Sequence, residues 1–132
     1  MILYPNVNHT LVELMKMGIK LAVVSDAPSR EAWMRIYYLN LHNHFDIVLT
    51  FDDTNARKPS PIPFQMALKE LKTEPSETLM VGDWPERDVP PARKVIGVFV
   101  SFAYLRIDIT SDSFSGLDTA FGTRRYMLAS CA

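Results

Sequence analysis

Short apolar runs rich in β-branched residues alternate along this chain with amphipathic stretches of about ten residues. The apolar runs have the length of strands in a sheet and are short for helices. Strands that alternate with helices form βαβ units, in which the strands are parallel and helices cover both faces of the sheet. Strands are predicted at residues 19–24, 45–51, 78–81 and 98–102, and helices at residues 29–39, 61–72 and 90–94. The sequence therefore predicts an α/β fold with a Rossmann-like parallel sheet.

Apolar stripes assign the buried faces of the helices. In the helix at residues 29–39, Trp33, Ile36 and Tyr37 are expected to point inward, and Trp33 and Tyr37 are interpreted as core residues. Gly18 follows an earlier helical stretch, at the place where a left-handed residue often ends a helix.

Length and charge limit the classes of function open to the chain. Its 132 residues are enough for one hydrophobic core, and its formal net charge of −1 gives no electrostatic reason to bind nucleic acid or an anionic membrane. A single cysteine, Cys131, excludes an internal disulfide framework. No apolar run approaches the roughly 18 residues of a transmembrane helix. We therefore expect a cytoplasmic protein with neither nucleic acid nor membrane as a partner.

Ser25 comes directly after the first predicted strand, at the carboxyl end of its apolar run. Ligands of open α/β sheets bind in the crevice at this end, where a hydroxyl can donate a hydrogen bond to a phosphoryl oxygen. The alternative is an ordinary turn, in which Ser25 or Asp26 accepts hydrogen bonds from nearby backbone amides.

Lys58 lies in a proline-rich stretch just before the helix at residues 61–72. Prolines restrict the backbone and so fix the direction in which the lysine points. An ammonium group there can stabilise negative charge on a transferring phosphoryl group. The alternative is a solvated surface lysine, because any single lysine in a loop can simply point into water.

Two aspartates follow the third predicted strand: Asp83, directly after Gly82, and Asp88. A strand that ends in this way delivers carboxylates to the crevice, and carboxylate oxygens are ligands that Mg²⁺ prefers. The alternative is a turn carboxylate and a helix cap. Two close carboxylates repel each other without a nearby cation, which favours the metal interpretation. Asp52 and Asp53, after the second strand, could line the rim of the crevice, but they are interpreted as part of a polar loop.

Taken in order, these features resemble the haloacid dehalogenase superfamily of phosphohydrolases. The matching segments are Val23-Val24-Ser25-Asp26, Lys58-Pro59-Ser60-Pro61 with Phe64, Ala67 and Leu68, and Val81-Gly82-Asp83 with Asp88. The resemblance covers about residues 3–100. It implies a Mg²⁺-dependent phosphatase or related hydrolase that acts on a small phosphorylated metabolite through an aspartyl-phosphate intermediate.

The resemblance also implies a role for each matching residue. Ser25, with Asp26 beside it, would bind the phosphoryl group, and Lys58 would stabilise charge on that group. Ser25 and Lys58 are therefore the candidate catalytic residues. Asp83 would coordinate Mg²⁺ directly or through water, and Asp88 would support that shell.

The nucleophile of the family belongs to a first motif, Asp-x-Asp-x-Thr, and no such motif precedes Ser25. The family places this motif on a central strand, between the strands that correspond to residues 20–25 and 78–81. Its loss leaves two half-sheets with bare inner edges, so that the sheet is expected to be incomplete at its centre. We expect a partner chain, a domain swap or a rearranged sheet to fill the gap, and the first two would give a homo-oligomer or a complex.

The chain divides into an α/β core at residues 1–102 and an atypical tail at residues 103–132. Residues 104–112 of the tail are strand-like and offer one candidate for the central strand, with Asp108 as a substitute nucleophile. Without the family's aspartate, the chain is expected to have little or no hydrolase activity. The alternative is a non-catalytic protein that oligomerises through open sheet edges, or a truncated fragment.

Overall fold

The computed structural model describes residues 3, 5–82, 86–87, 90, 99–101 and 126–131. Within these ranges, five strands form one sheet in the order β2-β1-β5-β3-β4, and all neighbouring strands are parallel. The strands are β1 (Lys20–Ser25), β2 (Ile47–Leu49), β3 (Thr78–Gly82), β4 (Phe99–Ser101) and β5 (Tyr126–Cys131). The predicted α/β fold with a parallel sheet is therefore confirmed.

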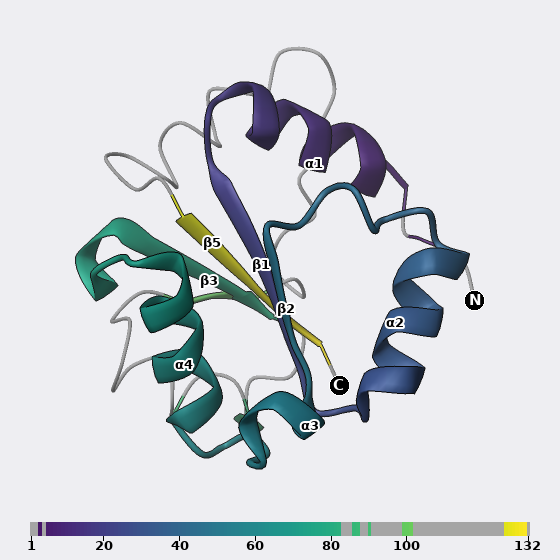
Figure 1. Cartoon of the computed structure of the whole chain (residues 1–132). Coiled ribbons are helices and arrows are strands. Elements are labelled where there is room, and N and C mark those ends of the chain that lie inside the picture. The colour runs from purple at the N-terminus through teal and green to yellow at the C-terminus, as the bar shows by residue number, and fades with distance from the viewer. Residues whose placement is uncertain are drawn as a thin grey trace.

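Helices cover both faces of this sheet. α1 (Val7–Lys16) and α2 (Ser29–Tyr38) lie on one side and α4 (Ile62–Leu71) on the other (Figure 1). Two short elements, α3 (Phe51–Thr54) and the 3-10 helix η1 (Pro75–Glu77), connect the longer ones. No helix in the described ranges has the length and hydropathy that a bilayer crossing requires.

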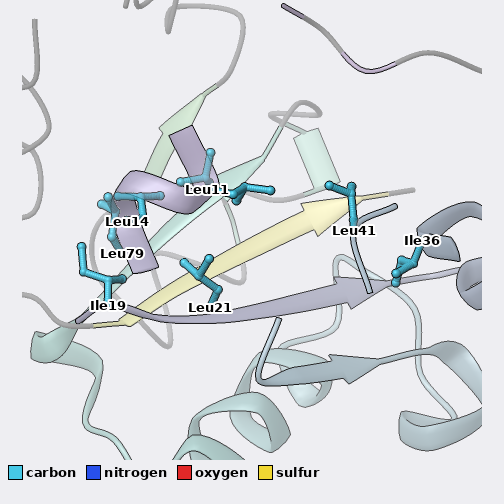
Figure 2. Packing of buried hydrophobic residues seen from close by; sticks show 8 residues of the cluster. Leu11, Leu14, Ile19, Leu21, Ile36, Leu41 and Leu79 are labelled. Atoms are coloured by element: carbon cyan, nitrogen blue, oxygen red, sulfur yellow. The ribbon is translucent and has the colours of Figure 1, made fainter. Parts of the chain in front are cut away.

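Side chains that alternate along β1 and β3 build one hydrophobic core on each face of the sheet. Towards α1 and α2 lie Leu11, Leu14, Ile19, Leu21, Ile36, Leu41, Leu79 and Val81 (Figure 2). Towards α4 lie Ala22, Val24, Leu49, Phe64, Ala67, Leu68 and Met80. Because consecutive residues of β1 and β3 belong to opposite cores, both strands are held from two sides.

The buried face of α2 differs from the predicted one. Ala32 and Ile36 are buried, whereas Trp33 is 37% and Tyr37 58% exposed. Residues 32 and 36 are one helical turn apart, and each aromatic residue lies one position further round the helix. The prediction that Trp33 and Tyr37 belong to the core is therefore wrong. Gly18 has a φ of +77°, so its predicted left-handed conformation is confirmed.

The second strand is shorter than predicted because a capped helix begins where the prediction continued the strand. The carboxylate of Asp53 accepts hydrogen bonds from the Thr50 backbone N–H and the Thr50 hydroxyl, both at 2.8 Å. This reciprocal cap starts α3 at Phe51. Asp52 accepts a hydrogen bond of 2.8 Å from the backbone N–H of Ser29, at the start of α2. Asp52 and Asp53 thus form helix-capping contacts, and the loop interpretation is wrong.

The central position of the sheet is occupied by β5, which comes from the tail (Figure 1). Its backbone pairs with β1 from Lys20 opposite Tyr126 to Ser25 opposite Cys131, and with β3 from Thr78 to Val81. Of the three ways in which we expected the gap to be filled, the structure has the rearranged sheet. The other candidate strand, residues 104–112 with Asp108, lies outside the described residues, as does most of the helix predicted at residues 90–94.

Candidate functional site

The carboxyl ends of the three central strands meet at one edge of the sheet. Val23 of β1 and Val81 of β3 both pair with Ala129 of β5. From this common level β1 continues for two residues to Ser25, and β3 for one residue to Gly82. This edge of a parallel sheet is where α/β proteins bind ligands. The strand register therefore brings the end of β1 and the end of β3, which Asp83 follows in the sequence, to the same edge of the sheet.

Ser25 is buried at this edge, with 4% of its surface exposed. Its Oγ accepts a hydrogen bond of 3.1 Å from the backbone N–H of Ala27. This is the turn geometry of the alternative interpretation. A hydroxyl has one proton and two lone pairs, so accepting one bond leaves its proton able to go to a ligand oxygen. The turn and the phosphate-binding role are therefore compatible.

Asp26 connects the end of β1 to the loop before α4. Its Oδ1 accepts a hydrogen bond of 3.0 Å from the backbone N–H of Lys58, and its Oδ2 forms an ion pair with the guanidinium of Arg87. Arg87 also donates a hydrogen bond of 3.5 Å to the Lys58 carbonyl oxygen. Asp26 and Arg87 thereby hold the Lys58 backbone from both its N–H and its carbonyl side.

Lys58 itself is buried, with 5% of its surface exposed. A lysine is rarely buried unless its charge is compensated, because removing an ammonium group from water is costly. The solvated surface lysine of the alternative interpretation is thus wrong. The structure brings Lys58 next to Asp26, which lies 32 positions earlier in the sequence and directly follows Ser25.

Asp83 and Asp88, the predicted metal ligands, lie outside the described residues. Gly82, which precedes Asp83, is buried at the end of β3. The two carboxylates have the chemistry that suits Mg²⁺. Within the described part of the chain, no group of three His, Cys, Asp or Glu side chains is arranged to hold a metal ion.

The sequence matches one known protein family. The family model of haloacid dehalogenase-like hydrolases matches residues 1–101. The chain belongs to this family. The match includes Ser25, Asp26 and Lys58, as well as Asp83 and Asp88, so the residues that the sequence singles out all lie in the haloacid dehalogenase-like region.

Two curated relatives in this region are phosphatases by name. The chain is 35% identical over 92 residues to glyceraldehyde 3-phosphate phosphatase of Methanocaldococcus jannaschii, covering 70% of the chain and 40% of the relative. It is 41% identical over 80 residues to pyrophosphatase PpaX of Bacillus mycoides, covering 61% of the chain and 37% of the relative. The haloacid dehalogenase-like chain therefore spans about two fifths of the length of these relatives.

A solved structure supports the same family fold. The haloacid dehalogenase-like phosphatase from Thermococcus onnurineus has a TM-score of 0.73 and 32% sequence identity, and the alignment covers 93% of this chain and 60% of that one. The likeness to a putative β-phosphoglucomutase from Thermotoga maritima, with a TM-score of 0.69 and 22% identity, supports the fold alone.

Sequence reasoning did not single out Arg87. The residue lies between Asp83 and Asp88 in an acidic stretch, and its ion pair with Asp26 spans 61 positions of the sequence. A basic side chain inside an acidic motif is the signal that could have drawn attention to it. Its partner could not have been identified, because only the fold brings the two segments together.

Proposed function

We propose that this haloacid dehalogenase-like chain carries the phosphate-binding and metal-binding parts of a Mg²⁺-dependent phosphatase for a small phosphorylated metabolite. The observation that supports this most is the burial of Ser25, Asp26 and Lys58 together at the carboxyl end of β1. A cytoplasmic location belongs to the same proposal.

Ser25 and Lys58 take different parts in binding the phosphoryl group. The hydroxyl proton of Ser25 is donated to one phosphoryl oxygen, and the ammonium group of Lys58 offsets the negative charge. Charge-assisted hydrogen bonds are shorter and stronger than neutral ones, and burial strengthens them further. Lys58 therefore contributes more to affinity than Ser25.

Asp26 acts by positioning Lys58 rather than by touching the phosphate. One of its carboxylate oxygens accepts the Lys58 N–H and the other pairs with Arg87. A carboxylate next to a phosphate would also repel it, since both are negatively charged. Arg87 belongs to the same positioning unit, because it contacts both Asp26 and the Lys58 carbonyl.

Asp83 and Asp88 would hold the Mg²⁺ ion. When bound, the ion would neutralise negative charge on the phosphoryl oxygens. Repulsion between two carboxylates and a phosphate makes the cation a requirement for phosphate binding at neutral pH.

The 132-residue chain alone is proposed to hydrolyse phosphate esters little or not at all. No aspartate precedes Ser25, and β5 contains no carboxylate among Tyr126–Cys131. Positioned cations do not replace a missing nucleophile. The alternative, oligomerisation through bare inner edges, has less support, because β5 pairs with both of these edges within one chain.

Binding of inorganic phosphate in the presence of Mg²⁺, measured by calorimetry, tests the binding roles. Lys58→Met is expected to weaken binding about ten- to a hundredfold, the equivalent of one charge-assisted hydrogen bond, and Ser25→Ala somewhat less. Lys69→Met, at an exposed position of α4, is the matched control and should leave the affinity unchanged. Equal losses in Lys58→Met and Lys69→Met would contradict a phosphate site at Lys58.

Hydrolysis of p-nitrophenyl phosphate with Mg²⁺ tests the proposed lack of turnover. The purified chain should release nitrophenol at the rate of the buffer blank. Turnover by the chain that disappears in Asp83→Asn would contradict the proposal, because it would require a nucleophile within these residues.

A further inference from the structure

We propose that the central slot, the space in the sheet between β1 and β3, is a strand-acceptor site of which β5 is an exchangeable occupant. An extended, β-branched segment of another polypeptide is the partner that fits it. β5 alone joins the two halves of the described sheet, yet its sequence suits a central strand poorly.

The two edges of the central slot require an occupant. β1 offers six backbone pairing positions to β5, and β3 offers four. The slot runs through the core of the sheet, since Ala22 and Val24 of β1 and Met80 of β3 are 0% exposed. An empty slot would leave backbone N–H and C=O groups unpaired beside apolar residues, which costs stability and invites strand addition.

β5 lacks the β-branched residues usual in a central strand, although it begins with Tyr126, a residue that favours strands. Central strands of parallel sheets are usually rich in valine and isoleucine. β1 contains Val23 and Val24, whereas β5 reads Tyr-Met-Leu-Ala-Ser-Cys and has no β-branched residue. Alanine in particular has a low strand propensity. A valine- and isoleucine-rich segment would therefore pair with the same edges more favourably.

The advantage of β5 is its attachment to the same chain. Twenty-four residues separate it from the end of β4. A tether of this length corresponds to an effective concentration of roughly millimolar or below. An untethered strand with a better sequence can overcome such an advantage, since segments add to exposed sheet edges mainly through main-chain hydrogen bonds.

Peptide binding to the full chain tests the exchange. The probe is a fluorescently labelled valine- and isoleucine-rich peptide of the same length as β5, followed by anisotropy and by hydrogen exchange. Binding should saturate, and the amides of Tyr126–Cys131 should lose protection while those of β1 keep theirs. Absence of binding at millimolar peptide, or binding with β5 still protected, would overturn the proposal.

A reversible lock provides the sharper comparison. The backbone of Ser25 pairs with that of Cys131, the only cysteine of the sequence, so Ser25→Cys puts two cysteines at paired positions of adjacent strands. A spacing of about 4.8 Å between adjacent strands lies within the range of Cα–Cα distances that a disulfide spans. Oxidation should weaken peptide binding at least roughly tenfold by removing the exchange, and reduction of the same sample should restore it. Equal affinities in the oxidised and reduced states of the cross-linked variant would show that β5 is not the exchanging strand.

Exchange and phosphatase function can be told apart with two peptides, one ending in aspartate and one in asparagine. Both peptides should bind equally if the central slot exchanges its strand. Hydrolysis of p-nitrophenyl phosphate with the aspartate peptide alone would support the proposed function as well. Binding of both without hydrolysis would support exchange and count against that function, and binding of neither would overturn exchange.

Discussion

Asp26 is the residue on which the geometry of the candidate site depends. It is 7% exposed, and its two carboxylate oxygens serve different loops, one through Lys58 and one through Arg87. A buried ion pair contributes little net stability by itself, but removing one partner leaves the other charge uncompensated. Asp26 therefore matters more to the integrity of the site than its small size suggests.

Replacing Asp26 by alanine is expected to destabilise the chain by about 2–4 kcal/mol, because the Lys58 amide and the Arg87 guanidinium both lose their carboxylate acceptor. Urea unfolding followed by circular dichroism measures the change. Glu13→Gln is the control: it removes an ion pair with Lys16 whose side chains are 25% and 68% exposed, and such surface pairs contribute about 1 kcal/mol or less. Similar losses in the two variants would mean that Asp26 has no special place in the fold.

At the residue scale, sequence reasoning reached Ser25, Asp26 and Lys58 but not Arg87. The first three adjoin predicted elements, so that the end of a strand or the start of a helix indicates where they lie. Arg87 acquires its importance from Asp26, which is distant in the sequence. Pairwise contacts between loops follow from the tertiary structure and leave no local pattern.

Among the elements, α2 is a helix whose bounds were predicted correctly but whose buried face was not. Its bounds, Ser29–Tyr38, agree closely with the predicted range of 29–39. Its largest side chains nevertheless lie on the outer face, with Met34 60% and Tyr38 72% exposed. The sizes of the side chains suggested an aromatic core, whereas the buried residues of α2 are the smaller Ala32 and Ile36.

Ile36→Ala is expected to destabilise the chain by about 2–4 kcal/mol, since it removes buried methyl groups from the core beneath α2. Tyr38→Ala, on the exposed face of the same helix, should change the stability by about 0.5 kcal/mol or less. Thermal and urea unfolding of both variants make the comparison. A larger loss for Tyr38→Ala would mean that the aromatic face is the buried one.

The strands differ in how clearly the sequence predicts them. β1 and β3 were predicted to within one residue at each end because they are continuous apolar runs with valine or threonine. β5 was not predicted, since Tyr126–Cys131 has no β-branched residue and follows a polar stretch. It occupies the centre of the sheet because the inner edges of β1 and β3 both require a pairing strand. That requirement follows from the rest of the fold and leaves no pattern in residues 126–131.

At the scale of the whole molecule, the pairing of β5 with both inner edges of the sheet affects whether the chain is expected to form oligomers. The expectation of an oligomer rested on bare inner edges of β1 and β3, and β5 pairs with both. The outer strands, β2 and β4, are three residues long each, and short edge strands are poor templates for association. The inner-edge argument for an oligomer is thereby removed.

Light scattering across a range of concentrations should give a constant mass near 15.0 kDa, that of one chain. Ala129→Pro is the informative variant, because proline removes a backbone N–H from the centre of β5 and weakens its pairing. Its mass should rise with concentration as the inner edges become available. A dimer in the unsubstituted chain would restore the expectation that strands are shared between copies.

The position of β5 in the sequence also determines when, during synthesis, the sheet can be completed. A ribosome makes β1, β3 and β4 before it reaches Tyr126, so the residues of both half-sheets are synthesised before the strand that unites them. At about 5–20 residues per second, the 24 residues after β4 take roughly 1–5 s to translate. During that interval the inner edges of β1 and β3 cannot pair with β5, because β5 has not yet been made. Completion of this sheet must therefore wait for the synthesis of β5, whatever else has folded by then.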